Sequence, residues 1–318
     1  MKTKQIIIFF LASLIMSACG DDDPVYIHDN SKRSSIGDDK SANDNKNTSG
    51  PKEAQTRYEF PRLKGGSDNV VIVHRAMLNQ KIGEEGINYC VEWDTGKHAQ
   101  RWSCYQLYRS VNYKSGDNVT RYKADNDGTL SSYCQYPNDP DLKAEHHFTT
   151  DPYKGSGFDH GHICPSADRL RATEANYQTF YITNMQPQRN AFNAGLWEKM
   201  EERVRYWADQ NDTLYVCKGG TIDSERNIRS YLGSGTNKIP VPRYFFMALF
   251  GKKGTAVRAL GLWVEHLDDD HSNDNIRNYA VSIKRLEELT GIDFFCNLPD
   301  DTEKKAEADL NLSDWNLQ

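Results

Sequence analysis

The sequence lacks an excess of positive charge, a paired-cysteine metal motif, an internal repeat and a comfortable membrane span. The formal net charge is -6, so bulk electrostatics do not indicate a nucleic-acid binder, and any such site needs a local basic patch. No Cys-x-x-Cys spacing occurs, and this spacing is the one that most often supplies two of the four ligands of a structural zinc site. No repeat is visible, which excludes a repeat architecture. The apolar stretch 6–16 is too short to cross a membrane comfortably.

What is present suits a folded domain with a leader. The chain has 318 residues, of which 26% are charged and 11% aromatic. Residues 1–18 combine Lys2 and Lys4 with an apolar core and small residues, and they predict a signal peptide. Cys19 closes a lipobox-like ending, so we expect lipidation at Cys19 and a bacterial outer-membrane lipoprotein facing the periplasm or the cell surface. An ordinary signal peptide with a chance cysteine is the alternative.

Three segments are therefore predicted: a signal peptide at 1–18, a lipidated and disordered polar tether at 19–57, and one domain at 58–318. The tether has hardly an apolar residue, so it cannot bury a core. Six cysteines remain beyond Cys19, and an even number in an exported chain predicts at least one disulfide in the domain.

Strand and helix patterns follow one another without regular alternation. Strands are predicted at 69–77, twice within 87–110, and at 214–217, 241–250 and 258–264. A helix is predicted over 190–210 because Leu196, Met200 and Val204 recur at intervals of four. A last helix is expected to end at Gly291. This order favours an α+β fold with a mostly antiparallel central sheet and flanking helices.

The stretch GFDHGHICPSADR, residues 157–169, concentrates groups that can do chemistry. Three readings are open from these residues alone. His162 can act as a base near neutral pH; His160, His162 and Cys164 can contribute to a zinc site; or the stretch is a polar loop without chemistry.

A second polar cluster begins at Thr183. Asn193 and Glu201 lie eight residues apart, a little over two helical turns, and so share roughly one side of the predicted helix. A hydrated Mg²⁺ often takes a single protein oxygen, and the Asn193 amide suits that role. Alternatively, Asn184 and Asn193 are turn and N-cap residues and Glu201 is a surface charge.

Together the two clusters resemble the DNA/RNA non-specific endonucleases, which include endonuclease G and the sugar-nonspecific bacterial nucleases. The resemblance rests on Asp-His-Gly-His at 159–162, Cys-Pro-Ser-Ala-Asp-Arg at 164–169, Asn184 with Pro-Gln at 187–188, Asn-Ala-Gly-Leu-Trp at 193–197, and Glu201. It covers roughly residues 65 to 310.

The resemblance implies a ββα-metal nuclease fold, also called a His-Me finger, and Mg²⁺-dependent hydrolysis of DNA and RNA, with Mn²⁺ as an alternative ion. His162 would be the general base, Asn193 the metal ligand and Glu201 a carboxylate holding the metal's waters, while Asn184 would orient the site. Arg169, Arg189 and Arg121 would bind the substrate, with Arg121 on the loop before the motif. Basic residues inside or just after the motifs favour a local patch, or form solvated faces balanced by nearby glutamates: Arg169, Arg171, Arg189, Lys199, Arg203 and Arg205.

One departure from the family pattern concerns position 160, where the family has arginine and this chain has His160. His160 either takes over a weaker cationic role or hydrogen-bonds within a turn. The alternative function is a nuclease-derived surface lipoprotein that binds nucleic acid or a protein partner without cleavage. Retention of His162 and Asn193 favours the enzyme, because binding alone needs neither.

Overall fold

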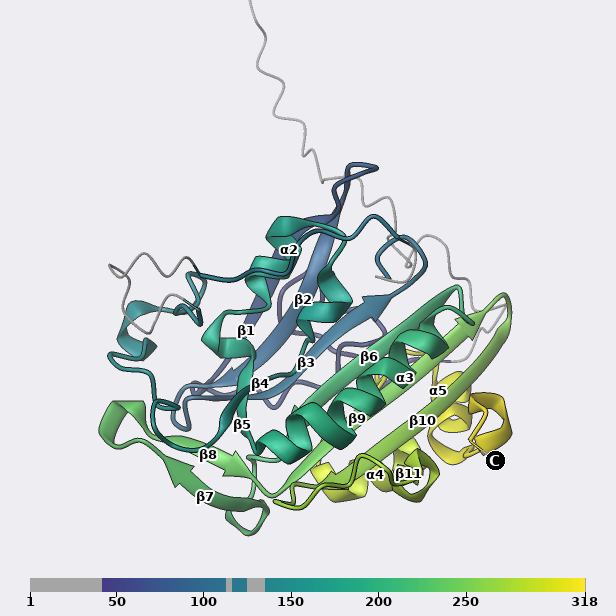
Figure 1. Cartoon of the computed structure of the whole chain (residues 1–318). Helices are drawn as coiled ribbons and strands as arrows, with labels where there is room; N and C mark the ends of the chain where they lie inside the picture. The colour runs from purple at the N-terminus through teal and green to yellow at the C-terminus, as the bar shows by residue number, and fades with distance from the viewer. Residues whose placement is uncertain (1–41, 113–115, 125–134, 318) are drawn as a thin grey trace, which may run out of the picture.

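A computed structural model describes residues 42–112, 116–124 and 135–317. A seven-stranded sheet forms the centre of the molecule, in the order β1-β2-β3-β6-β9-β10-β11 (Figure 1). Each neighbouring pair of strands is antiparallel. The strands are β1 Asn69–Asn79, β2 Glu84–Asp94, β3 Ala99–Leu107, β6 Thr213–Gly220, β9 Tyr244–Lys253, β10 Ala256–Glu265 and β11 Ala280–Val281.

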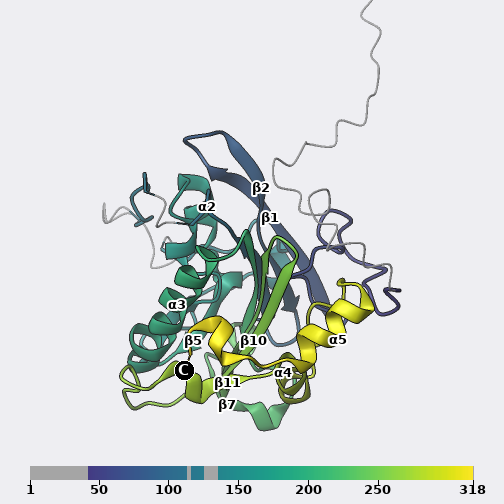
Figure 2. The same ribbon diagram turned by 90° about the vertical axis from the view of Figure 1, so that its right-hand side faces the viewer.

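Both faces of this sheet are buried, so successive residues of a central strand enter opposite cores. On β6, Leu214 and Val216 join one apolar cluster, whereas Tyr215 and Cys217 join the other. Figure 2 shows α3 (Glu198–Ala208) on one side of the sheet and α4 (Ile283–Thr290) and α5 (Asp300–Ala308) on the other. The central strands therefore read as nearly continuous apolar runs rather than alternating ones.

A small β-hairpin unit leads into α3. β4 (Asp159–His162) and β5 (Met185–Gln188) pair antiparallel, and the short helix α2 (Thr173–Gln178) lies in the connection between them. A π-helical segment, Phe192–Trp197, then leads directly into α3. The predicted stripe packs inward as expected, because Leu196, Met200 and Val204 are all buried.

The β4–β5 pair depends on a glycine at position 161. A Cβ atom there would lie 2.2 Å from Cδ of Gln188, whose side chain crosses over the strand. No side chain larger than hydrogen fits without moving Gln188. The glycine within Asp-His-Gly-His is thus a steric requirement of this hairpin.

The strand predicted over 241–250 is two strands. A hairpin of β7 (Ile228–Leu232) and β8 (Ile239–Pro242) ends at Pro242, and β9 begins at Tyr244. Prolines at positions 240 and 242 cannot donate to a central ladder, which suits β8 to a two-stranded pair. The closing helix behaves as predicted, because Gly291 ends α4 in the left-handed region at φ +73°.

The tether predicted at 19–57 is wrong over its last part. Residues 42–57 lie against the domain: Asn47 is buried and bonds to Asn297, and Ala54 is fully buried. Polar side chains attach this segment to the domain, since Asn45 also donates a hydrogen bond to Glu303. Composition alone could not reveal the segment, because its contacts are hydrogen bonds to a surface some 250 residues away. Residues 1–41, including Cys19, lie outside the described residues.

The disulfide prediction is wrong for the five cysteines that the structure describes. All five are buried and free: Cys90, Cys104, Cys164, Cys217 and Cys296. Three of them face each other across β2, β3 and β6 within one apolar core, where they serve as small packing residues. Cys134 lies outside the described residues. Over the described ranges, no helix is long and apolar enough to cross a membrane.

Candidate active site

His162, the last residue of β4, is held in an apolar setting. Its ring lies at a right angle to Phe180, with centroids 4.8 Å apart. Its Nε2 atom is buried and has no hydrogen-bond partner within the described part of the chain. Burial, followed by the positive charge of Arg121 and by His160, lowers the pKa of His162 to about 3. The imidazole is therefore neutral near pH 7 and offers Nε2 as a proton acceptor.

Asn193 is oriented by the first residue of the same strand. Its Nδ2 donates to Oδ2 of Asp159 over 3.0 Å, and Nδ2 of Asn190 donates to the same oxygen over 2.9 Å. Because the Asn193 amide nitrogen is hydrogen-bonded to the Asp159 carboxylate, the Asn193 amide oxygen is the atom available to bind a cation. Asp159 and His162 are three residues apart on β4, or about 10 Å along a strand. β4 thus carries both His162 and the carboxylate that orients the Asn193 amide.

Sequence reasoning gave Asp159 no role, although it stands within the quoted motif. Its side chain is the element that fixes Asn193. The signal was available in principle, because an acidic residue three positions before a candidate base can reach the helix that follows the hairpin. A metal held by one amide needs this kind of second partner.

Glu201 projects from α3 toward the central sheet, not toward solvent. Its Oε1 accepts a hydrogen bond from Nζ of Lys218 over 2.6 Å, and its side chain is 12% exposed. Burial raises the pKa of Glu201, and the charge of Lys218 opposes that rise. The alternative that Glu201 is a surface charge is therefore wrong. Lys218 itself was missed, because one lysine within an apolar strand has no motif around it.

These residues fit a hydrated divalent cation. Asn193 supplies one neutral oxygen, Asp159 fixes its orientation, and Glu201 supplies a carboxylate that is already paired. So few anionic ligands suit Mg²⁺, which keeps several of its waters, better than ions that demand a complete protein cage.

Asn184 holds the backbone and does not face the site as a reactive group. Its Oδ1 accepts from the backbone N–H of Cys164 and from Ser103, and its Nδ2 donates to the carbonyls of Cys164 and Thr179. The side chain is fully buried and its hydrogen-bonding capacity is used. The predicted catalytic role is corrected to one of positioning, which agrees with the expectation that it orients the site.

His160 is sandwiched between two tyrosines. Tyr136 stacks on one side with centroids 3.7 Å apart, and Tyr153 on the other at 4.0 Å. Its Nε2 faces Oδ1 of Asp151 at 3.1 Å. Of the two roles considered for this position, the structure supports a fixed hydrogen-bonded histidine. Held in this way, the ring does not present a free cation to a substrate.

The zinc alternative is wrong. Cys164 is fully buried, and burial raises the pKa of its thiol to about 12, far from the thiolate that zinc requires. Nε2 of His160 is taken by Asp151. Among the described residues, the groups close enough to share an ion are His74 with Asp139 and Asp141, and Glu287 with Asp293 and Glu307; neither includes the motif histidines.

The first of these groups is an ion-paired histidine. Nε2 of His74 lies 3.1 Å from Asp139, and Nδ1 lies 3.5 Å from Asp141. Burial alone would lower its pKa, but the two carboxylates raise the pKa of His74 to about 9. A metal would need one ring nitrogen unprotonated, whereas here each nitrogen faces a carboxylate. The arrangement is that of a histidine paired with two carboxylates.

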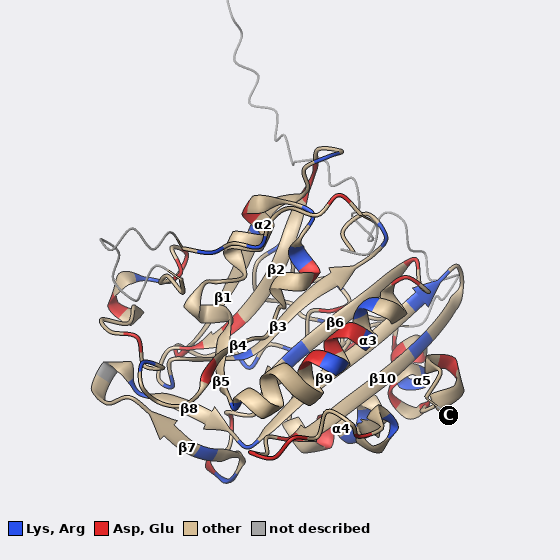
Figure 3. Cartoon of the chain, viewed as in Figure 1, with Lys and Arg blue, Asp and Glu red and all other residues tan. Residues whose placement is uncertain are grey.

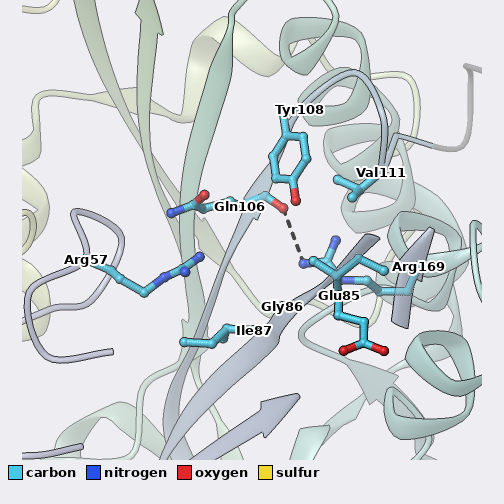
Figure 4. A pocket seen from close by; sticks show the side chains of 9 residues that line it. Arg57, Glu85, Gly86, Ile87, Gln106, Tyr108, Val111 and Arg169 are labelled. Carbon is cyan, nitrogen blue, oxygen red and sulfur yellow. Dashed lines mark hydrogen bonds between the residues drawn. The ribbon is translucent and has the colours of Figure 1, made fainter. Parts of the chain in front are cut away.

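The three arginines predicted to bind the substrate differ in their exposure to solvent. Arg169 is buried, and its guanidinium donates to the carbonyls of Asn88, Asp168 and Gln106. Figure 4 shows its bond to Gln106 at the edge of a small internal cavity. A guanidinium committed to buried carbonyls cannot reach a phosphate, so this prediction is corrected.

Arg189 and Arg121 lie at the surface. The guanidinium of Arg189 packs over the ring of Phe158 at 3.9 Å and pairs with Asp268. Arg121 is exposed, and its positive charge lowers the pKa of His162. Both stay predictions for substrate binding.

The predicted basic patch is not continuous. Arg169, Arg171 and Arg205 are buried, and Lys199 donates to the carbonyls of Ser272 and Asp274. Figure 3 shows acidic and basic residues interspersed along α3. Any nucleic acid must therefore be bound mainly by residues outside this helix.

Three comparisons with known proteins agree with this geometry. The family model for DNA/RNA non-specific endonucleases matches residues 80–301. The chain is 26% identical over 233 residues to a mitochondrial nuclease of *Xenopus laevis* named EXOG, covering 71% of this chain and 61% of that protein. It is 31% identical over 170 residues to a nuclease of *Nostoc*, covering 51% of this chain and 60% of that protein. The chain thus spans about three fifths of the length of these relatives.

The fold is also found among solved structures. A complex of EndoG with EndoGI, described as showing the mechanism of EndoG inhibition, aligns with a TM-score of 0.55 and 21% identity. The alignment covers 66% of this chain and 84% of that one. The predicted α+β, ββα-metal fold with a mostly antiparallel sheet is confirmed.

Proposed function

Because the chain belongs to the DNA/RNA non-specific endonuclease family, we propose that it is a Mg²⁺-dependent endonuclease that hydrolyses phosphodiester bonds of DNA and RNA. The observation that carries this proposal is the neutral imidazole of His162, with an unpaired Nε2, on the same short strand as the carboxylate that orients Asn193. Pure binding requires neither feature.

His162 acts as the general base in this proposal. Nε2 takes a proton from a water molecule that attacks the phosphorus, and the ring is unprotonated before the reaction. The low pKa makes uptake of this proton the harder step and its later release to solvent the easier one. Phe180 holds the ring plane while this happens.

Asn193 and Glu201 hold the cation side of the site. When bound, Mg²⁺ supplies charge stabilisation at the phosphate and the leaving oxygen. Asn193 offers its amide oxygen, and Asp159 stops the amide from turning over. Glu201 accepts hydrogen bonds from the waters of the cation. Mn²⁺ prefers similar oxygen ligands and is the expected substitute.

Substrate contacts confined to phosphates read no base edge and require no 2′-hydroxyl, which is why we propose both DNA and RNA as substrates. Arg121 is the proposed phosphate contact nearest the base, because its charge acts on His162. Arg189 is the second, on the far side of Phe158.

The test is cleavage of plasmid DNA and of structured RNA with and without Mg²⁺. His162→Ala should lose about 10²- to 10⁴-fold in rate with little change in the Mg²⁺ concentration for half activity. Asn193→Ala should instead raise that concentration. Full activity in His162→Ala, or equal cleavage in excess EDTA, would overturn the assignment; binding without cleavage by the wild type would support the non-catalytic alternative.

We also propose that the mature protein is a lipoprotein attached through Cys19 and directed to the bacterial outer membrane, either periplasmic or surface-facing. The support is the sequence of residues 1–19 and the acidic run that follows. Labelled palmitate should enter the wild type and not Cys19→Ser. Equal labelling of the two would contradict the proposal.

A further inference from the structure

Lys218 lies inside the molecule beneath the proposed site. It stands on β6 between Cys217 and Gly219, and its residue exposure is 0%. Nζ lies 2.6 Å from Oε1 of Glu201 and 4.8 Å from the ring centroid of Trp197. The ammonium group is thus enclosed by one carboxylate and one aromatic face.

A buried ammonium is costly unless it is paired, and an apolar side chain at this position would avoid that cost. The neighbours of Lys218 in the sheet do not require a charge, since its register partners are Ser103 on β3 and Met247 on β9. Lys218 forms its ion pair with Glu201. The lysine is therefore best explained by what it does to that carboxylate.

Lys218 is the cation placed directly against Glu201. The Glu201 side chain is 12% exposed, and burial raises its pKa, as does the charge of Asp168, whereas the charges of Lys218 and Arg205 lower it. Of these two cations, Arg205 is paired with Asp168 at 3.0 Å, and Lys218 forms the ion pair with Glu201 at 2.6 Å.

We propose that Lys218 is a positioning residue that holds the Glu201 carboxylate in place, through its 2.6 Å ion pair, for the water shell of a cation held by Asn193. The inference rests on the proposed function. Lys218 lies outside the sequence motifs of the site. It acts by positioning the Glu201 carboxylate and itself contacts neither the substrate nor the cation.

The first measurement is Mg²⁺ binding, followed as the rise in melting temperature during a Mg²⁺ titration without nucleic acid. Lys218→Met should raise the Mg²⁺ concentration for half of this effect by about 10- to 100-fold, as expected when the partner of a metal-site group is removed. Lys252→Met is the matched control, because Lys252 is a largely buried lysine on β9 without a contact to Glu201. The control should leave the titration unchanged.

The second measurement is a double-mutant cycle on cleavage rate. If Lys218 acts through Glu201, Lys218→Met should cost about 10- to 100-fold in the wild type and nothing further in Glu201→Gln. A purely structural lysine would give a deficit that adds to that of Glu201→Gln.

The outcomes separate the two claims. Absence of Mg²⁺-dependent cleavage in the wild type would refute the proposed function. Normal wild-type cleavage with additive losses in the double-mutant cycle would refute the role of Lys218 alone. An unchanged Mg²⁺ titration in folded Lys218→Met would also refute it.

Discussion

The buried His74 makes stability depend on pH in a way that can be worked out. Below pH 6.5 the ring is protonated in both the folded and the unfolded chain, and its pairing with Asp139 and Asp141 stabilises the fold in full. As pH rises from 6.5 through about 9, the unfolded chain has already lost the proton that the folded chain keeps, so this stabilisation is lost. The gap between the two pKa values corresponds to about 3 kcal/mol.

The perturbation is His74→Gln, which cannot be charged but can still donate to Asp139. Urea unfolding at a series of pH values gives the free energy of unfolding of both proteins. We expect the wild type to exceed the variant near pH 6.5, and this difference to shrink by about 3 kcal/mol by pH 10. Taking the difference between wild type and variant at each pH removes the contribution of other groups that titrate over the same pH range, because both proteins contain them.

Asp141→Asn is the matched control. Asp141 is 60% exposed whereas Asp139 is fully buried, so loss of the exposed partner should cost no more than about 1 kcal/mol. If the difference between wild type and His74→Gln stays constant from pH 6.5 to 10, the ring is neutral in the folded protein and the reasoning is wrong. A stabilising effect of Zn²⁺ that depends on His74 would favour a metal site instead.

Two further predictions concern other parts of the molecule. Burial and the charges of Glu307 and Asp293 raise the pKa of Glu287 to about 8, so its ionisation costs stability from pH 4.5 upward and the full cost is present above pH 8. Glu287→Gln should therefore raise the free energy of unfolding at pH 9 by more than about 1 kcal/mol and have little effect at pH 4.5, as urea unfolding at both values would show. Gly161→Ala should destabilise the β4–β5 hairpin by about 1–3 kcal/mol, because its Cβ would lie 2.2 Å from Gln188. An unchanged melting temperature and full activity in that variant would show that Gln188 moves aside freely.

Local patterns in the chain carry most of the fold. Period-four apolar residues define the helix that contains Met200 and Val204, and Gly291 ends α4 because only glycine takes a positive φ there at low cost. Errors arose where partners are distant. The prolines of β8 split one predicted strand, and residues 42–57 reach their partners only through the folded chain.

The motif residues were identifiable from the sequence because their spacing follows from one hairpin and one helix. His162, Asn193 and Glu201 belong to these two local elements, so their order along the chain suffices to propose a site. The burial and the charged neighbours of those residues, by contrast, are set by the tertiary structure. The low pKa of His162 comes from burial and from Arg121 on a separate segment, and the pKa of Glu201 reflects its burial and the opposing charge of Lys218 on β6.

The sequence by itself determined the fold class and the family resemblance, and it was enough to propose His162 as the base and Asn193 as the metal ligand, because each of these depends on short-range spacing. The tertiary structure alone decided which charges are available. It buried Arg169 against backbone carbonyls, enclosed His160 between Tyr136 and Tyr153, and paired Lys218 with Glu201. Charge and reactivity depend on solvent exposure and on partners that only folding brings together, and no local pattern of residues encodes either one.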